Sequence, residues 1–289
     1  MKKYTQAAPA KINLALDILG RRPDGYHEMR MVMQAVSLCD TVSLEEAGEG
    51  FVLSARGMEL PEGRKTLEQR AAEAFFAAAG LPMPGLRVTL EKVTPAYAGL
   101  GGGSADVAAL LRMLRERYAP DMPPEKLEEA GSAVGSDVPF CVRGGTALAE
   151  GRGEALTDLP PLPDCRFVIC KPDFDLPTPR MFARLRFDGE RSRPDVDGMA
   201  EALRRGDLRA VADRVGNVFE EVLLAEERRE IDGVRETLLR HGALAAAMSG
   251  SGPAVFGLFA PDGTDGEALE ALKRRYAQVF QARPVGRLL

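Results

Sequence analysis

Alternation of apolar and polar positions predicts several β-strands in the first third of the chain. Residues 12–18 alternate large apolar side chains with small or polar ones, and this period of two is typical of a half-buried strand. Residues 29–44 predict one long strand or two short ones, and 51–55 and 85–93 predict two more. The Pro and Gly of "RRPDGY" at 21–26 place a turn after the first strand.

Apolar residues at helical intervals predict helices between and after these strands. Thr66-Leu-Glu-Gln69 has the pattern of a capping box at the start of a helix. The apolar face predicted for this helix consists of Leu67, Ala71, Ala74, Phe75 and Ala78. Further elements are predicted as helices at 107–114, 197–213, 226–241 and 265–277, and as strands at 166–170 and 253–259.

The length of 289 residues suggests two domains or one large one. The segment "LTDLPPLPDC" at 156–165 has three prolines in ten residues, which is typical of a linker. We therefore expect an N-terminal domain over residues 1–158 and a C-terminal domain over 159–289.

Charge and hydropathy argue against a nucleic-acid or membrane protein. The net charge is −5, the isoelectric point is about 5.4, and no run of the sequence forms the basic stripe of a nucleic-acid binder. Residues 242–261 carry no formal charge and are long enough to span a bilayer, but "SGSGP" at their centre would break a helix. We read this stretch as a helix end, a glycine loop and a strand.

The cysteines and histidines do not form a metal-binding pattern. The four cysteines at 39, 141, 165 and 170 include no C-x-x-C pair, and the sequence has only two histidines. Scattered single cysteines are typical of buried thiols in a reducing compartment, so we expect a cytoplasmic protein.

The stretch "PAYAGLGGGS" at 95–104 has the glycine content of a phosphate-binding loop. It lacks the Lys of a P-loop, and Ser104 stands where the dinucleotide fingerprint has its third glycine. A predicted strand precedes it and a predicted helix follows, and helix N-termini stabilise anions. The alternative is a structural turn. The residues expected to hold a phosphate chain are Pro95, Ala96, Tyr97, Ala98, Gly99, Leu100, Gly101, Gly102, Gly103, Ser104 and Ala105.

Three motifs in order resemble those of the GHMP kinase superfamily. They are Pro9-Ala-Lys11-Ile-Asn13, the loop at 95–105, and Ser249-Gly-Ser-Gly252. The resemblance covers nearly the whole chain. It implies an α+β fold of two domains, a ribosomal-protein-S5-like N-terminal domain that binds ATP and a ferredoxin-like C-terminal domain, with the site in the cleft between them.

Further segments resemble one branch of this superfamily. "RRPDGYHEM", "SDVPFCVRGGTALAEGRGE" and "LPTP" at 176–179 are similar to stretches of kinases acting on CDP-linked methylerythritol. The resemblance implies transfer of the γ-phosphate of ATP, accompanied by Mg²⁺, to the substrate 2-hydroxyl, a step of non-mevalonate isoprenoid precursor synthesis. The sequence departs from the usual residues of this branch at Thr66, Leu176–Pro177 and Val218–Phe219. Thr94 is a further departure.

With the motifs in place, two charged residues are the catalytic candidates. A sugar hydroxyl is a poor nucleophile, so a carboxylate that accepts its proton is needed, and Asp137 matches the position of that base. Lys11 would be its charge partner and would stabilise the attacking oxygen. The alternatives are an ordinary turn or N-cap for Asp137 and an outward surface lysine for Lys11.

The remaining candidates concern binding. Ser104 either caps the helix after the glycines or contacts phosphate or Mg²⁺, and no other metal ligand is evident. Tyr26 offers a face on which cytosine could stack, and His27 could hydrogen-bond the base edge. The further candidates for substrate contact are Asn13 and Thr178, and those for shaping the pocket are Ser249 and Gly250. A packed turn and a plain hairpin turn are the alternatives for Tyr26–His27 and for 249–250.

Several other functions are compatible with part of the pattern. A mevalonate- or homoserine-type kinase would share the three motifs but not "DGYH" and "DVPF". A non-catalytic ATP-binding relative would tend to lose Lys11 or Asp137. The S5-like domain admits a nucleic-acid-binding module, against which the acidic composition argues. A monomer and a homodimer both remain open.

Overall fold

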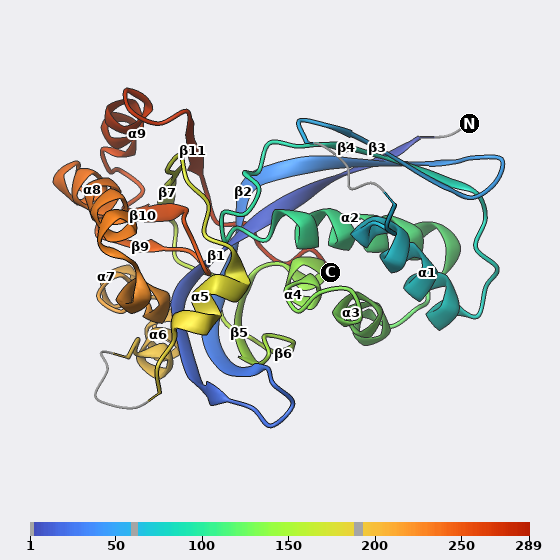
Figure 1. The fold of residues 1–289 in the computed structure, drawn as a ribbon, viewed down its shortest axis with the longest axis horizontal. Coiled ribbons are helices and arrows are strands. Elements are labelled where there is room, and N and C mark those ends of the chain that lie inside the picture. Colours follow the sequence, from blue (N-terminus) through green and yellow to red (C-terminus); the bar gives the residue numbers. More distant parts are fainter. Residues whose placement is uncertain (1–2, 59–62, 188–192) are drawn as a thin grey trace.

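The architecture is α+β, as the sequence predicts, and it has an N-terminal sheet covered by helices and a smaller C-terminal sheet (Figure 1). A computed structural model describes residues 3–58, 63–187 and 193–289. The N-terminal elements are β1 (Tyr4–Arg21), β2 (His27–Glu46), β3 (Phe51–Arg56), α1 (Leu67–Ala79), β4 (Leu86–Glu91), α2 (Gly102–Tyr118), α3 (Pro124–Ser132), α4 (Val138–Arg143), β5 (Thr146–Gly151) and β6 (Ala155–Asp158).

Two long antiparallel strands form the backbone of the N-terminal sheet. β1 and β2 pair from Tyr4 opposite Leu44 to Arg21 opposite His27, so residues 29–44 belong to one long strand. The strand order is β3-β4-β2-β1-β8, and β5 pairs with both β2 and β6. Helices α1 to α4 cover one face of this sheet (Figure 1).

The prediction of a half-buried first strand is wrong. Residues 10–18 are buried on both faces, and a register shift between Asn13 and Ala15 changes which residues face which side. Ile12 and Leu14 pack in a core shared with the C-terminal sheet. Residues 16 and 18, after the shift, belong to the other hydrophobic core cluster of the protein. The uninterrupted alternation of side chains along this strand therefore gives no sign that they change sheet faces after Asn13.

Helix α1 begins where its capping sequence predicts, but its apolar face differs from the prediction. The Thr66 hydroxyl accepts a hydrogen bond from the backbone N–H of Gln69 at 3.3 Å. Ala71 and Phe75 are buried as expected, whereas Leu67 and Ala78 are exposed. The buried face also includes Ala72 and Phe76, so it is rotated from the predicted one.

The C-terminal half has the antiparallel strand order β11-β7-β10-β9, with α8 and α9 packed against it (Figure 1). In chain order this is 4-1-3-2, the order of a ferredoxin-like sheet, which confirms the expectation. Its elements are β7 (Arg166–Lys171), α5 (Thr178–Arg184), α6 (Val196–Arg204), α7 (Leu208–Ala212), β8 (Gly216–Asn217), the 3-10 helix η1 (Val218–Val222), α8 (Ala225–Arg240), β9 (Ala245–Met248), β10 (Val255–Phe259), α9 (Asp265–Lys273) and β11 (Gln278–Ala282).

The single helix predicted at 197–213 is in fact two, α6 and α7. Gly206 between them has a φ of +64°, which ends the first helix because only glycine adopts this conformation readily. The Asp207 side chain then caps the second helix by accepting a hydrogen bond from the N–H of Ala210 at 3.0 Å.

Two segments beyond residue 158 pair with N-terminal strands, and the domain division at that residue stays a prediction. β8 runs parallel to β1. The last residues of the chain return to the N-terminal half, where Val285 N–H donates to Ala35 at 2.8 Å and Leu288 N–H donates to Arg143 at 2.8 Å.

In the described part of the chain, none of the helices has the length and apolarity needed to cross a bilayer.

Removal of residues 284–289 is expected to lower the free energy of unfolding by about 3 kcal/mol. The backbone hydrogen bonds that this segment makes to Ala35, Arg143 and Gly145 would be lost, at about 1 kcal/mol each. Urea denaturation would measure the change. Arg287→Ala, which removes only an exposed side chain and its surface ion pair to Asp158, is the control and should change stability by less than about 1 kcal/mol. Equal stability of the shortened and full chains would contradict the expectation.

Candidate active site

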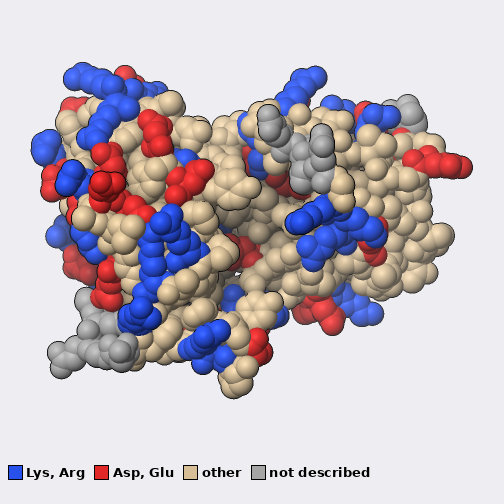
Figure 2. Space-filling model, in the orientation of Figure 1, with Lys and Arg blue, Asp and Glu red and all other residues tan. Residues whose placement is uncertain are grey.

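A cavity of about 2080 Å³ lies between the N-terminal helices and the C-terminal half. The surface is hollowed at this place (Figure 2). Its walls come from β1, from the loop that joins β4 to α2, from α5 and from the loop that joins β9 to β10. All three sequence motifs therefore contribute to one hollow.

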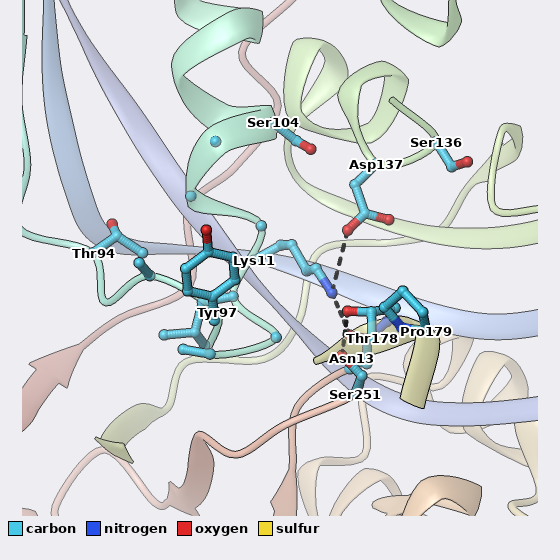
Figure 3. A pocket seen from close by; sticks show the side chains of 18 of the residues that line it. Lys11, Asn13, Thr94, Tyr97, Ser104, Ser136, Asp137, Thr178, Pro179 and Ser251 are labelled. Atoms are coloured by element: carbon cyan, nitrogen blue, oxygen red, sulfur yellow. Dashed lines mark hydrogen bonds and ion pairs between the residues drawn. The ribbon is translucent and has the colours of Figure 1, made fainter. Parts of the chain in front are cut away.

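The glycine-rich loop follows strand β4 and runs into α2, which is the predicted strand–loop–helix order. Helix α2 begins at Gly102, and its N-cap is Gly101 with a φ of +67° and no side-chain capping bond. The alternative in which Ser104 caps this helix is therefore wrong, because Ser104 lies within the first turn. Its hydroxyl points toward the side of the cavity where Asp137 lies (Figure 3). Backbone N–H groups of a first helical turn lack helical partners, so they are available to an anion.

The C-terminal loop holds the glycine-rich loop in place. The Ser249 hydroxyl donates to the carbonyl of Gly99 at 3.0 Å and accepts from the N–H of Asn13 at 3.3 Å. Ser249 is fully buried, so it shapes the pocket from behind, whereas Gly250 and Ser251 line the cavity directly. A Cβ atom at Gly99 would lie 2.0 Å from the Ser249 carbonyl oxygen, which makes glycine necessary there.

Asn217 supports this loop and was not predicted to do so. Its side-chain amide donates to the carbonyls of Met248 and Gly250, both at 2.7 Å, and its carbonyl oxygen accepts from the N–H of Phe219. In the sequence it is a single Asn within "RVGNVFEE", and nothing there distinguishes it from an ordinary structural residue. The departures at 218–219 fill the core, since both residues are buried.

Lys11, Asn13 and Asp137 meet at the centre of the cavity (Figure 3). The Lys11 ammonium lies 3.5 Å from Asp137 Oδ2 and donates to Asn13 Oδ1 at 2.6 Å. Lys11 is only 4% exposed, so it is not the outward surface lysine of the alternative reading. Asp137 occupies the N-cap position of α4, but its side chain makes no capping bond and is directed at Lys11. Because Asn13 accepts the hydrogen bond from Lys11, it holds the ammonium group in position beside Asp137.

Aromatic side chains gather at one end of the cavity. The His27 ring lies 4.6 Å from that of Phe182 and 5.9 Å from that of Phe187, and burial together with nearby Arg21 lowers the pKa of His27. Tyr26 is 54% exposed and lines the same end. The two phenylalanines were missed because nothing in "RMFARLRF" distinguishes them from core residues.

Thr178 stands at the first turn of α5 and borders the cavity. Its hydroxyl is 2.8 Å from that of Ser251, so α5 and the C-terminal loop are joined at the cavity wall. Ser251 was not predicted as a site residue, although it lies within the third motif. Pro177, one of the departures, occupies the N-cap of α5, and Leu176 is buried.

A buried ionic cluster forms the opposite wall. The Lys92 ammonium contacts the carboxylates of both Asp40 and Asp106. Burial raises the pKa of Asp106 to about 7 despite the proximity of Lys92. Thr94 Oγ1 and Asp106 Oδ1 are buried without a hydrogen-bond partner. Sequence reasoning missed this cluster because its members come from three separate elements.

Comparison with known proteins agrees with the family resemblance of the three sequence motifs. A GHMP kinases N terminal domain model matches residues 66–145, and a GHMP kinases C terminal model matches residues 199–278. A 4-diphosphocytidyl-2-C-methyl-D-erythritol kinase of Geobacillus sp. (strain WCH70) is 40% identical over 280 residues, which cover 96% of each chain. The chain belongs to the GHMP kinase family.

Solved structures agree with the fold. A crystal structure of a 4-(cytidine 5'-diphospho)-2C-methyl-D-erythritol kinase superposes with a TM-score of 0.80 at 34% identity, covering 98% of this chain and 100% of that one. A homoserine kinase from Cytophaga hutchinsonii superposes with a TM-score of 0.78 at 20% identity, covering 99% of this chain and 96% of that one. The second likeness shows the fold alone.

Gly99→Ala is expected to lower the free energy of unfolding by about 2 kcal/mol or more. The added methyl group would overlap the Ser249 carbonyl, and alanine is strained at the φ of +75° found there. Gly103→Ala is the matched control, because its Cβ would meet only the end of the Leu67 side chain at 3.6 Å and φ is ordinary. Urea denaturation without nucleotide should find the control as stable as the parent. Equal losses of stability in the two variants would contradict the conclusion that contact with Ser249 makes glycine necessary at position 99.

Stability is also expected to depend on the protonation of Asp106. Its pKa of about 7 in the folded protein lies above its ordinary value, so the folded state binds the proton more tightly, and stability falls as pH rises from about 4 to 7. Asp106→Asn lacks this titration. The free energy of unfolding of the parent should therefore decline relative to that of the variant by roughly 1–3 kcal/mol between pH 5 and 8. Parallel pH profiles from urea denaturation would disprove the assignment.

Proposed function

We propose that this chain is an ATP-dependent kinase that phosphorylates the 2-hydroxyl of 4-diphosphocytidyl-2-C-methyl-D-erythritol, in the supply of isoprenoid precursors. The observation that carries the proposal is the Lys11–Asp137 pair, which lies beside the glycine-rich loop in a cavity with an aromatic end. The full-length similarity to kinases named for this substrate supports the same reaction.

The donor half of the cavity suits a nucleotide triphosphate. A Cβ at Gly99, Gly101 or Gly102 would crowd Ser249, Lys11 or Thr94, so the packing favours glycine at these positions, and all three residues line the cavity. The first turn of α2 would hold the phosphates, and the Ser104 hydroxyl would bind a phosphate oxygen or Mg²⁺. Leu53, Leu67 and Leu90 line the end where the base would lie.

The metal would depend on the nucleotide for most of its ligands. Among the residues that the structure describes, no three His, Cys, Asp or Glu side chains are grouped to hold an ion. ATP bound with Mg²⁺ supplies the transferred phosphoryl group and partial neutralisation of its charge. The protein contributes positioning and the groups described next.

The acceptor would place its base against the aromatic end and its polyol near Asp137. Tyr26 provides an exposed ring face, and a neutral His27 can both donate and accept a hydrogen bond at a base edge. Thr178 and Ser251 lie close to Asn13 and the Lys11 ammonium (Figure 3), where the substrate hydroxyls would pass. This arrangement favours a substrate with a nucleobase over mevalonate or homoserine.

Asp137 acts as the general base. Its carboxylate accepts the proton of the attacking hydroxyl as the oxygen approaches the γ-phosphorus atom. The Lys11 ammonium stabilises the negative charge that develops on that oxygen. Asn13 and the backbone around Gly101 fix the ammonium, since the Lys11 methylenes pack against Gly101. This fixed geometry supplies much of the rate, because phosphoryl transfer depends on alignment.

Asp137→Asn and Lys11→Met are expected to reduce kcat by about 100-fold to 10,000-fold, because each removes a charge used in the transition state. ADP release would be measured with Mg-ATP and 4-diphosphocytidyl-2-C-methyl-D-erythritol, with mevalonate and homoserine as control acceptors. Asp137→Asn should stay folded and lose far less thermal stability than turnover, because this side chain is 32% exposed although the buried Lys11 ammonium loses its charge partner. Turnover of a control acceptor in place of the cytidine substrate would reject the proposed function.

A further inference from the structure

Three arginines surround the aromatic end of the cavity. Arg21, Arg152 and Arg186 all line the hollow. Within the described ranges, neither Arg21 nor Arg186 forms an ion pair or a hydrogen bond through its side chain. Two cations on the wall of one cavity that have no anionic partner among the described residues indicate an anionic ligand.

Each of the three arginines lies near an aromatic residue of this end of the cavity, either in space or along the chain. The Arg152 guanidinium lies 4.7 Å from the centre of the Tyr26 ring, a cation–π distance. Arg21 is close enough to His27 to lower its pKa. Arg186 directly precedes Phe187, whose ring contacts His27.

The carboxylates of the cavity lie elsewhere. Asp137 is paired with Lys11, and Asp106 is paired with Lys92 and close to Glu68. Arg152 does have acidic neighbours. Asp24 is close enough for its charge to interact with that of Arg152, and the Arg152 Nε lies 3.6 Å from a Glu154 oxygen. That contact is long and leaves the two terminal nitrogens of the guanidinium for a ligand.

We propose that Arg21, Arg152 and Arg186 form a diphosphate-binding rim that selects acceptors carrying a nucleoside diphosphate. This inference rests on the proposed function and assigns acceptor specificity to residues outside the catalytic pair. A base stacked at Tyr26 has its diphosphate within reach of these side chains, and guanidinium groups bind phosphate oxygens through paired hydrogen bonds. The rim acts on acceptor binding and leaves the donor half unchanged.

The test compares two probes that differ only in the diphosphate, CDP and cytidine. Calorimetry on the parent chain should find CDP bound more tightly than cytidine, with a preference that weakens as salt is added. Arg186→Gln should reduce CDP affinity by roughly 5-fold to 20-fold and leave cytidine affinity unchanged. Arg152→Gln should reduce CDP affinity by a similar factor and cytidine affinity by less, because Arg152 also lies against the Tyr26 ring. Arg152→Lys, which keeps the charge, should retain part of the preference.

The control variant is Arg209→Gln, because the Arg209 side chain is 71% exposed on α7 and pairs only with Asp213 among the described residues. It should bind both probes as the parent does. Loss of the CDP preference in the Arg152 and Arg186 variants supports the rim, and equal losses for CDP and cytidine, or an unchanged ratio, overturn it. Turnover of the parent chain with the methylerythritol substrate tests the proposed function separately. KM for that substrate should rise in the variants while KM for ATP stays constant.

Discussion

The site depends on holding one lysine ammonium group inside the protein. Lys11 is almost fully buried, and a buried charge is tolerated only when partners replace the water it loses. Asn13 and Asp137 are those partners, and the Lys11 side chain runs along Gly101. A Cβ at Gly250 would lie 3.2 Å from the Lys11 ammonium nitrogen, so the third motif is constrained by the same group. The three motifs are thus linked through one side chain.

Around this centre the cavity has two chemically different ends. The end proposed for the donor is formed by backbone, leucines and the buried Lys92 cluster, which is fixed by contacts within the protein. The end proposed for the acceptor has aromatic rings and three arginines, of which Arg21 and Arg186 have no ion-pair partner among the described residues. A kinase has to position two substrates. The rigid end suits the nucleotide that many kinases share, and the end with arginines suits a particular charged acceptor.

Sequence reasoning identified features that are local in the chain. The strand–loop–helix order around the glycines and the cap at Thr66 could be read from short segments. The candidates Lys11 and Asp137 depended on the order of the three motifs along the chain, and the structure brings these two charged residues together. The change of face after Asn13 could not be predicted, because a register shift leaves no mark in an alternating pattern. Phe182, Ser251, Asn217 and the Lys92 cluster became evident only through packing between distant segments.

The hydrogen bond from Ser249 to Gly99 makes the two halves of this enzyme poor modules for exchange. A loop of the C-terminal half sets the shape of the donor loop, and β8 and the last residues of the chain are bound into the N-terminal half. A chimera that took its C-terminal half from another family member would also take that member's loop at the position of Ser249. That loop would change the shape of the glycine-rich loop that is proposed to bind the phosphates of ATP. New acceptor preferences are therefore more accessible through changes in side chains on the cavity wall than through recombination of whole domains.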